Sequence, residues 1–363
     1  MKKILSWICI VFGLAVLVVG TSEQLFKQVH EVKNYQVNKA WWGEHHSDNG
    51  DLVNMAYLDD INTFRSPKDY VFTTSADTGA KNIDLYVWGD SYLEDVPEKA
   101  FAHVANYHFG RTYYEELHYK LDKSKRNILL IETSERFVRP YFSYKTIYKT
   151  LRKADGPITQ IVPLGSTKER TTEPAFTEHV NDLFNEHINQ NLEYLLFNYN
   201  FLNKPRTLKG DLNYLLFRRG SGTVVISDKG QNLFVKETLL PRHGYSCYQV
   251  LPNSDIDWFV KEFDSVYDHY KAEGFDEVYL SVIPTPVTIL QPARYNHFLP
   301  RVSAHHNMHM PLIDLYPIFK NDTAPSRLYR AGDTHWNNNG MQIWLSMVNE
   351  VLRKESGKLN SNL

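Results

Sequence analysis

Residues 83–91, which read IDLYVWGDS, decide the fold. The run up to Trp88 is largely apolar and rich in strand-forming residues, and it stops at a Gly-Asp-Ser triplet. Similar buried-strand patterns recur at residues 127–131 (NILLI) and 278–283 (VYLSVI), and amphipathic helical patterns accompany them. Buried strands that alternate with amphipathic helices are typical of a parallel sheet covered by helices. The sequence therefore predicts an α/β fold with a mainly parallel sheet.

Helical periodicity is clearest in the last third of the chain. One amphipathic pattern covers residues 259–270, and a final helix has apolar side chains on one face at Met341, Trp344, Leu345, Val348 and Leu352. Residues 152–250 do not follow the regular pattern, so we interpret them as an insertion. The insertion contains a predicted helix near residues 176–199 and a predicted β-hairpin over residues 211–240, with strands at Leu212–Arg218, Thr223–Ser227 and Leu233–Lys236.

The composition excludes several classes of protein. The chain has 363 residues, 42% of them apolar and 23% charged, which is typical of a globular protein and excludes a disordered or low-complexity chain. The formal net charge of −2 argues against nucleic acid as an electrostatically bound partner. Two cysteines, Cys9 and Cys247, are too few for a disulfide framework or a Cys-based zinc site. We expect no metal and no cofactor.

The N-terminus carries a membrane signal. Two lysines are followed by the seventeen residues Ile4–Gly20, in which Ser6 is the one polar side chain. This length is at the short end for a bilayer span and also fits a secretory signal. An uncleaved anchor is favoured because no typical cleavage pattern is present. In either case the lysines keep the N-terminus inside and place residues 21–363 outside the cytoplasm, in the periplasm or another extracytoplasmic space.

Ser91 is the first candidate catalytic residue. It follows the first buried strand through Gly89 and Asp90, and it is predicted to open a helix. A strand-to-helix turn exposes a serine hydroxyl and directs backbone N–H groups at the group that the serine attacks. Serine is also a frequent helix N-cap, so the triplet alone leaves a purely structural role open.

A second chemical signal lies in residues 330–340, which read RAGDTHWNNNG. Asp333 and His335 are two positions apart, so in an extended segment both side chains emerge on one face. The carboxylate could then accept a hydrogen bond from the imidazole and leave the other ring nitrogen free as a base. The Asn337–Asn338 pair is suited to cap the last helix. A structural capping loop is the alternative, but together with Ser91 the pattern favours nucleophilic catalysis.

These motifs resemble a known family. The segment Trp88–Ser91, followed far downstream by Asp333–Trp336, is similar to the SGNH (GDSL-type) hydrolase superfamily. It looks closest to the SGNH-like O-acetyltransferases of cell-envelope polysaccharides, such as the alginate O-acetylation proteins, which carry Asp-x-His-Trp where most SGNH hydrolases have Asp-x-x-His. Ile128–Arg136 and Val282–Pro286 are also similar to segments of such proteins. The resemblance spans roughly residues 83–353.

The resemblance implies a three-layer α/β fold and a division of the chain. The expected parts are an N-terminal anchor or signal (1–20), an N-terminal extension (21–80), an SGNH-like catalytic domain (81–353) that contains the insertion, and a C-terminal tail (354–363).

The resemblance also implies a serine acyl-enzyme. Ser91 would attack an acetyl carbonyl, His335 would take the proton of Ser91, and Asp333 would orient His335. The oxyanion would be held by the Ser91 N–H and by donors at the ends of neighbouring strands.

Two further oxyanion donors are expected from the family pattern. Gly110 stands where SGNH proteins supply a glycine. Where they supply an asparagine, this chain has Glu132-Thr133-Ser134, so a hydroxyl of Thr133 or Ser134 is the candidate third donor. Asp90 is expected to brace the turn rather than to act in the chemistry.

Four residues are weaker candidates for substrate binding. Trp336 could form part of a pocket wall, and Arg330 could meet an acidic sugar or brace Asp333. Glu132 and Arg136 could contact substrate or form a structural ion pair with each other.

Three functions remain open at this stage. The first is an O-acetyltransferase that acts on a cell-envelope or secreted polysaccharide beside a multi-pass membrane acyltransferase, which the family implies as the source of acetyl groups. The second is a carbohydrate acetylesterase with the same triad, because only access of water or sugar to the acyl-enzyme separates the two. The third is a non-catalytic carbohydrate-binding component of an envelope assembly.

Overall fold

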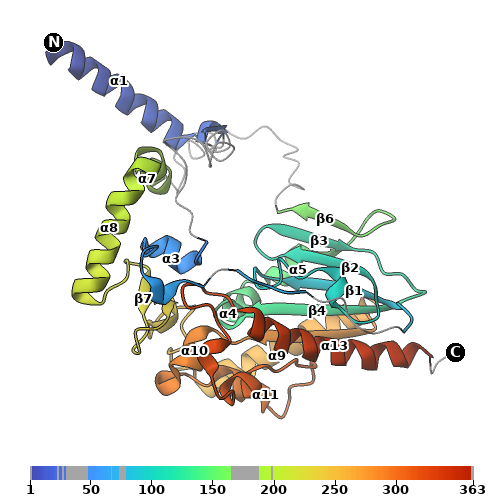
Figure 1. The fold of residues 1–363 in the computed structure, drawn as a ribbon. Helices are drawn as coiled ribbons and strands as arrows, with labels where there is room; N and C mark the ends of the chain where they lie inside the picture. The colour runs from blue at the N-terminus through green and yellow to red at the C-terminus, as the bar shows by residue number, and fades with distance from the viewer. Residues whose placement is uncertain are drawn as a thin grey trace.

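The computed structural model describes residues 2–22, 24–26, 28–29, 48–66, 68–72, 79–164, 188–197 and 199–360. Figure 1 shows a central sheet with helices packed against it, and an N-terminal helix that projects away from this body.

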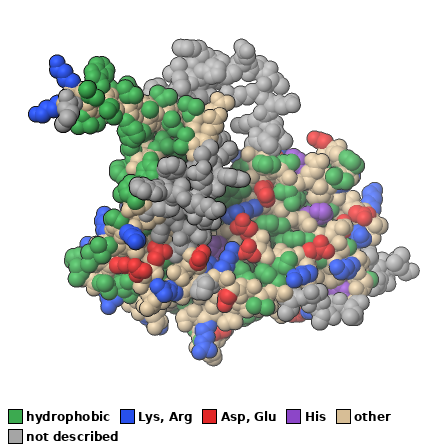
Figure 2. All heavy atoms as spheres, turned by 45° about the horizontal axis from the view of Figure 1, so that its top comes forward, with side chains coloured by type: hydrophobic (Ala, Val, Ile, Leu, Met, Phe, Trp, Pro, Cys, Tyr) green, Lys and Arg blue, Asp and Glu red, His purple; other side chains and the backbone are tan. Residues whose placement is uncertain are grey.

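The projecting helix is α1 (Lys2–Thr21). Among the described residues it is the one helix long and apolar enough to cross a membrane, with a mean hydropathy of 2.5. Its side chains are largely exposed, and Figure 2 shows them as a hydrophobic surface at the upper left of the molecule. By length, composition and position near the N-terminus, this helix has the properties of a membrane anchor or a signal sequence.

The central sheet has four parallel strands in the order β2-β1-β4-β9. The strands are β1 (Ile83–Gly89), β2 (Val104–Arg111), β4 (Arg126–Ser134) and β9 (Glu277–Ile283). β1 is buried along its whole length and β4 in all but its first residue, because both lie inside the sheet with helices over each face. The three predicted strands are confirmed. β2 is a partly exposed edge strand without a continuous apolar run, which explains why the sequence did not reveal it.

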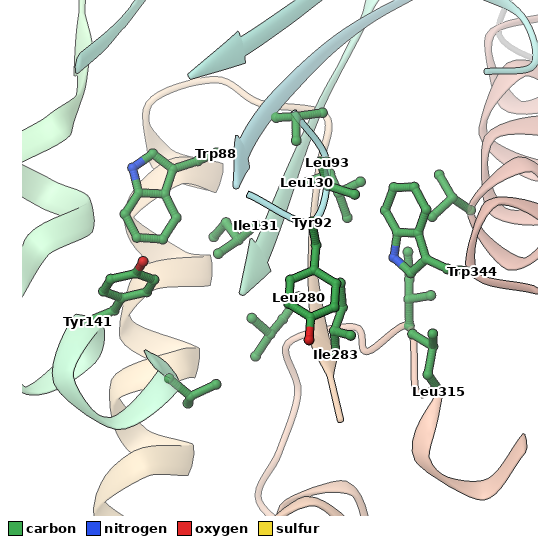
Figure 3. Close-up of a cluster of buried hydrophobic side chains, with 14 of the residues drawn as sticks. Trp88, Tyr92, Leu93, Leu130, Ile131, Tyr141, Leu280, Ile283, Leu315 and Trp344 are labelled. Carbon is green, nitrogen blue, oxygen red and sulfur yellow. The ribbon is translucent and has the colours of Figure 1, made fainter. Parts of the chain in front are cut away.

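Helices cover both faces of this sheet. The main ones are α4 (Glu135–Ser143), α9 (Asn253–Ala272) and α13 (Asn338–Asn360). Figure 3 shows Trp88 and Tyr141 on one side of the strands and Trp344 of α13 on the other side. Trp344 is fully buried, and its Nε1 donates to Ser281 Oγ of β9 at 2.9 Å. The predicted three-layer arrangement of a parallel sheet between helices is confirmed.

Shorter elements complete the body. The helices are α5 (Thr146–Thr150), α10 (Pro286–Leu290), α11 (Phe298–Ser303) and α12 (Tyr316–Lys320), with short 3₁₀ helices η1 (Asn62–Phe64), η2 (Glu98–Ala100), η3 (Lys236–Leu239), η4 (Pro292–Arg294) and η5 (Pro325–Arg327). A second sheet has the order β5-β3-β6 and consists of β3 (Glu115–Tyr119), β5 (Leu151–Lys153) and β6 (Gln160–Pro163). Strands this short have no readable periodicity.

The insertion differs from the prediction in one respect. β7 (Val224–Ile226) and β8 (Leu233–Val235) form an antiparallel pair, as expected for the second half of the predicted hairpin. The predicted strand Leu212–Arg218 is wrong, because these residues continue the helix α8 (Asn200–Phe217). Part of the helix predicted at 176–199 is present as α7 (Ile188–Phe197), and residues 176–187 lie outside the described residues.

Described residues of the N-terminal extension belong to the folded body. α3 (Asp51–Ala56) buries Leu52 and Val53 in a second hydrophobic cluster with Phe64, Tyr214 of α8 and Leu233 of β8. This cluster joins the extension to the insertion, so neither is an appendage in the part that the structure describes.

The C-terminal tail predicted at residues 354–363 starts within a helix. α13 continues to Asn360, and Glu355 in its last turns is buried. Its carboxylate pairs with Arg126 at the start of β4 and accepts a hydrogen bond from Tyr279 Oη at 2.7 Å. Residues 354–360 are therefore part of the last helix, and residues 361–363 lie outside the described residues.

Candidate active site

Ser91 lies at the carboxyl edge of the central sheet. It follows β1 through Asp90, close to the point where the neighbouring strand β4 ends at Ser134. The predicted helix after Ser91 is wrong: residues 91–95 form turns and a bend, and the next helical residues are those of η2. The Ser91 hydroxyl is therefore presented by a turn, without a helix N-terminus behind it.

Asp90 holds this turn in place. Its carboxylate accepts hydrogen bonds from the Tyr92 N–H and from the Ser134 N–H, both at 2.9 Å, and so joins the end of β1 to the end of β4. The Asp90 N–H donates to Glu132 Oε2 at 2.8 Å. A Cβ at Gly89 would lie 2.9 Å from the same Glu132 oxygen, so this position has no room for a side chain. The predicted bracing role of Asp90 is confirmed.

Glu132 is a buried carboxyl beside a second carboxyl. Burial raises the pKa of Glu132 well above its usual value, and the negative charge of Asp90 raises it further. The neutral form can donate a hydrogen bond to the Asp90 carboxylate, which removes the repulsion between the two groups. Glu132 therefore supports the serine turn and does not face a substrate.

His335 connects the serine to an acid. Ser91 Oγ lies 2.8 Å from His335 Nε2, and His335 Nδ1 lies 2.6 Å from Asp333 Oδ1. Asp333 Oδ1 also accepts the His335 backbone N–H at 3.0 Å. The segment is a bend and is not extended as predicted, and this local hydrogen bond explains why the two side chains meet. Ser91 and His335 are half-buried, whereas Asp333 is buried.

The geometry fixes the roles of the two ring nitrogens. An ionised carboxylate can only accept, so His335 Nδ1 carries the proton in the bond to Asp333. Nε2 then has a free lone pair and accepts the hydrogen bond of the Ser91 hydroxyl. The imidazole is thus positioned as a general base toward Ser91. Asn337 caps the helix that follows, since its Oδ1 accepts the Asn339 N–H at 2.9 Å.

Arg330 keeps Asp333 ionised. Burial alone raises the pKa of Asp333, but the hydrogen bond and charge of His335 and the charge of Arg330 outweigh this effect and lower the pKa well below its usual value. Arg330 is buried, its Nη1 pairs with Asp333 Oδ2, and its Nε donates to Ser66 O at 2.7 Å. Of the two predicted roles of Arg330, the structure supports bracing of Asp333 and not contact with an acidic sugar.

Asp51 is a site residue that the sequence did not reveal. It is the first residue of α3, and its carboxylate accepts the Thr334 N–H at 2.9 Å and the Thr334 hydroxyl at 2.6 Å. Thr334 lies between Asp333 and His335, so the hydrogen bonds from Thr334 to Asp51 fix residues 333–335, which we call the triad loop. Burial and the charge of Asp333 raise the pKa of Asp51. No local pattern marks this residue, because its partner is 283 positions away.

Aromatic side chains pack next to the His335 imidazole. The Tyr92 ring lies 4.7 Å from the His335 ring, centroid to centroid, and its hydroxyl donates to Thr334 O. Trp336 is fully buried and packs edge-on against Tyr92 at 5.2 Å. The prediction that Trp336 forms a pocket wall is therefore wrong, since this side chain belongs to the core.

The candidate oxyanion donors have different surroundings. Gly110 lies within β2 opposite Trp88, and a Cβ there would lie 2.8 Å from Leu117 Cβ, so close packing explains this glycine. The Thr133 hydroxyl donates to Ser134 O at 3.2 Å and is thus already engaged. The Ser134 hydroxyl is buried at the end of β4 and has no hydrogen-bond partner in the described structure. Ser134 itself is fully buried, so none of these three positions presents a donor to a substrate in this structure.

Arg136 does not pair with Glu132. Its guanidinium lies 4.5 Å from the centroid of the Phe137 ring, and in the described part of the chain no ion pair links it to a carboxylate. Arg136 lines a small pocket together with Tyr92 and Thr334, next to the triad loop. The structural ion pair predicted as one alternative is wrong, and Arg136 remains a candidate for substrate binding.

One group of side chains has metal-ligand character. Asp51, Asp333 and His335 offer ligand atoms within 4.8 Å of one another. The oxygens of both carboxylates already accept hydrogen bonds from Thr334, Arg330 and His335. The positive guanidinium on Asp333 also disfavours a cation at this place. The hydrogen-bond network accounts for this cluster.

Comparison with known proteins adds no family to this geometry. The chain matches no protein-family model, no curated protein and no solved structure. The feature that indicates a chemistry for this chain is therefore the triad of Ser91, His335 and Asp333 at the carboxyl edge of a parallel sheet.

Proposed function

We propose that the chain is an exported serine O-acetyltransferase, anchored by α1, that moves acetyl groups through an acetyl-Ser91 intermediate to hydroxyls of a cell-envelope or secreted polysaccharide. The observation that carries the proposal is the chain of hydrogen bonds from Ser91 through His335 to Asp333. A nucleophile, a base and an orienting acid in this order form the arrangement that activates a serine. The motif resemblance to SGNH-like O-acetyltransferases supports acetyl as the group and sugar as the acceptor.

The first half of the reaction would acylate the serine. Ser91 Oγ attacks the acetyl carbonyl while its proton passes to His335 Nε2. The tetrahedral intermediate collapses, the bond to the donor oxygen breaks, and His335 returns the proton to the leaving group. The Ser91 N–H is the donor that we assign to the oxyanion.

The second half would transfer the acetyl group. A sugar hydroxyl gives its proton to His335 Nε2 and attacks the carbonyl of acetyl-Ser91. The ester bond to Ser91 Oγ breaks, and the proton returns to this oxygen. Asp333 stabilises the imidazolium in both halves, and Arg330 and Asp51 keep the loop in position.

The membrane location is part of the proposal. The buried Asn191 of α7 donates to Gly20 O of α1 at 3.1 Å, and a Cβ at Gly20 would lie 2.8 Å from Leu192 Cδ2. This contact between α1 and the folded chain supports a retained anchor over a removed signal. An anchor would keep the enzyme beside a multi-pass membrane acyltransferase that supplies acetyl groups.

The test compares transfer with hydrolysis. The full chain is incubated with an activated acetyl ester and a neutral or acidic oligosaccharide, and acetylated oligosaccharide and free acetate are both measured. Ser91→Ala is the variant, and Ser265→Ala, an exposed serine on α9, is the matched control. The proposal expects oligosaccharide acetylation by the wild type and the control, and none by Ser91→Ala.

Two other outcomes would replace the proposal. Ser91-dependent acetate release that no acceptor diverts would identify an acetylesterase with the same triad. Turnover of neither kind by a folded wild-type chain would favour a non-catalytic carbohydrate-binding component.

A further inference from the structure

Helix α8 exposes the side of the helix that would normally be buried. Large apolar side chains on its outer surface are 45–68% exposed: Phe201, Leu208, Leu212, Leu215 and Leu216. Positions 201, 208, 212 and 215 follow helical spacing, so they form one continuous stripe along α8. An exposed apolar stripe of this size on a folded protein marks an interaction surface.

The opposite side of α8 makes the contacts with the body. Arg206 Nη1 donates to Tyr57 Oη at 2.6 Å, and a Cβ at Gly210 would lie 2.4 Å from Tyr57 O. The Tyr214 ring packs edge-on against Phe64 at 5.3 Å. The spacing of 206, 210 and 214 places these residues on one face. The outer stripe is therefore not the packing face of α8.

The charged side chains of α8 are also divided between its outer side and its inner side. Lys204 and Lys209 are exposed beside the apolar stripe, and Arg218 and Arg219 are exposed at its end. The acidic residue of the helix, Asp211, is half-buried and turned toward the acidic residues that follow α3. An apolar stripe edged by basic residues alone is suited to the surface of a bilayer that contains anionic lipid.

The position of α8 in the molecule agrees with such a surface. α8 follows α7, and α7 packs on the C-terminal end of the membrane-span candidate α1 through Asn191 and Gly20. Phe197, at the end of α7, is 50% exposed and leads into the stripe. Figure 1 shows α7 and α8 along the side of the body from which α1 projects, and Figure 2 shows hydrophobic side chains continuing down that side.

We propose that α8 lies on the outer surface of the membrane, with its apolar stripe in the interfacial region and its basic residues at anionic headgroups. The span α1 then crosses the bilayer, and α8 forms a second contact that fixes the orientation of the body. Because the inner face of α8 packs on the segment that begins with Asp51, this contact sets the height of the triad above the bilayer. The membrane contact does not depend on the chemistry at Ser91.

The test measures the depth of α8 in a bilayer. The full chain carrying Cys9→Ser is given a single exposed cysteine, Leu216→Cys, and labelled with an environment-sensitive fluorophore. The buried Cys247 is retained, and a sample without the new cysteine gives its background. Asp268→Cys, exposed on α9, is the matched control. Both are reconstituted into vesicles of phosphatidylethanolamine and phosphatidylglycerol that contain nitroxide-labelled lipid.

The proposal expects a blue-shifted emission and strong lipid quenching at position 216, with little quenching at position 268. Replacing phosphatidylglycerol by phosphatidylcholine should reduce the quenching at 216, because the basic residues lose their anionic partners. Leu208→Asp together with Leu212→Asp should abolish it while α1 keeps the chain in the vesicle. Quenching at position 216 that is as weak as at position 268 would overturn the proposal and point to a protein partner for the stripe.

Discussion

Replacement of Arg330 by methionine tests how the triad acid is kept ionised. Arg330 and Asp333 are both buried and pair directly, and Asp51 lies on the other side of the same loop. Methionine keeps much of the volume of the side chain but removes its charge and all its donors. Two carboxylates would then face each other without the cation.

The expected loss in the free energy of unfolding follows from the burial of the Arg330–Asp333 pair. Removing one partner of a buried ion pair costs about 3–5 kcal/mol, because the other charge remains in the interior. The backbone carbonyls of Ser66 and Asp48 also lose their donor from Arg330. Asp51→Asn in the same chain should restore part of the loss, since it removes the second negative charge.

The loss should depend on pH in a defined direction. The pKa of Asp333 is lowered below its ordinary value of 3.8 in the folded chain, so its ionisation contributes stability above pH 3.8 that disappears as the pH falls. Arg330→Met weakens this depression. The difference between wild type and variant should therefore be largest above pH 3.8 and should shrink in more acidic solution.

The assay is urea unfolding of the full chain in a mild detergent, followed by tryptophan fluorescence across this pH range. Arg327→Met is the matched control, because Arg327 is exposed three residues upstream and should change stability by less than about 0.5 kcal/mol. An Arg330→Met chain that matches the control, or a loss that grows toward acid pH, would refute the electrostatic role of Arg330.

Three other substitutions test the support of the site. Glu132→Gln should leave the free energy of unfolding unchanged near pH 4.5 and raise it relative to wild type at higher pH. The pKa of Glu132 is raised in the folded chain, so wild type loses stability as the pH rises, whereas glutamine stays neutral and can still bond to Asp90. Urea unfolding at a series of pH values measures this difference. Gly89→Ala should destabilise by about 1–3 kcal/mol through overpacking, whereas Gly222→Ala, which meets no atom within 4 Å, should be neutral in the same assay. Asp51→Ala should lower the turnover of an acetyl ester by about 100-fold through misplacement of the triad loop, and Asp51→Asn should retain more of it.

The strands and the Asp333–His335 pair could be predicted because their signals are local, whereas the pairing of His335 with Ser91, 244 positions away, was expected from the motif resemblance. Residues 83–88 show a buried strand within a single short window, and Asp333 and His335 are two positions apart. The sequence had no comparable signal for Asp51, whose contact with the triad loop spans 282 positions. Its neighbourhood depends on how the N-terminal extension packs, which no periodicity records.

The wrong prediction at residues 212–218 has a physical cause. Leu215, Leu216 and Phe217 form a continuous apolar run, and such a run is typical of a buried strand. In the structure these side chains are exposed at the end of α8. The spacing of Arg206, Gly210 and Tyr214 was the helical signal, but it consists of residues of unlike polarity and is invisible to a hydrophobic pattern.

Trp336 and Arg330 show the limit of motif reasoning at a site. Both flank the Asp-x-His pattern, so both were candidates for contact with substrate. The structure buries Trp336 against Tyr92 and places Arg330 on Asp333. Sequence proximity to a candidate catalytic residue does not determine whether a side chain faces the pocket or the core.

The most direct test of the central claim is intact-protein mass spectrometry after a short exposure of the full chain to an activated acetyl ester. Wild type, Ser91→Ala and Ser265→Ala are compared. The account predicts one acetyl adduct on wild type and on Ser265→Ala, and none on Ser91→Ala. A folded wild-type chain without an adduct, or an adduct that persists in Ser91→Ala, would contradict the assignment of Ser91 as the nucleophile.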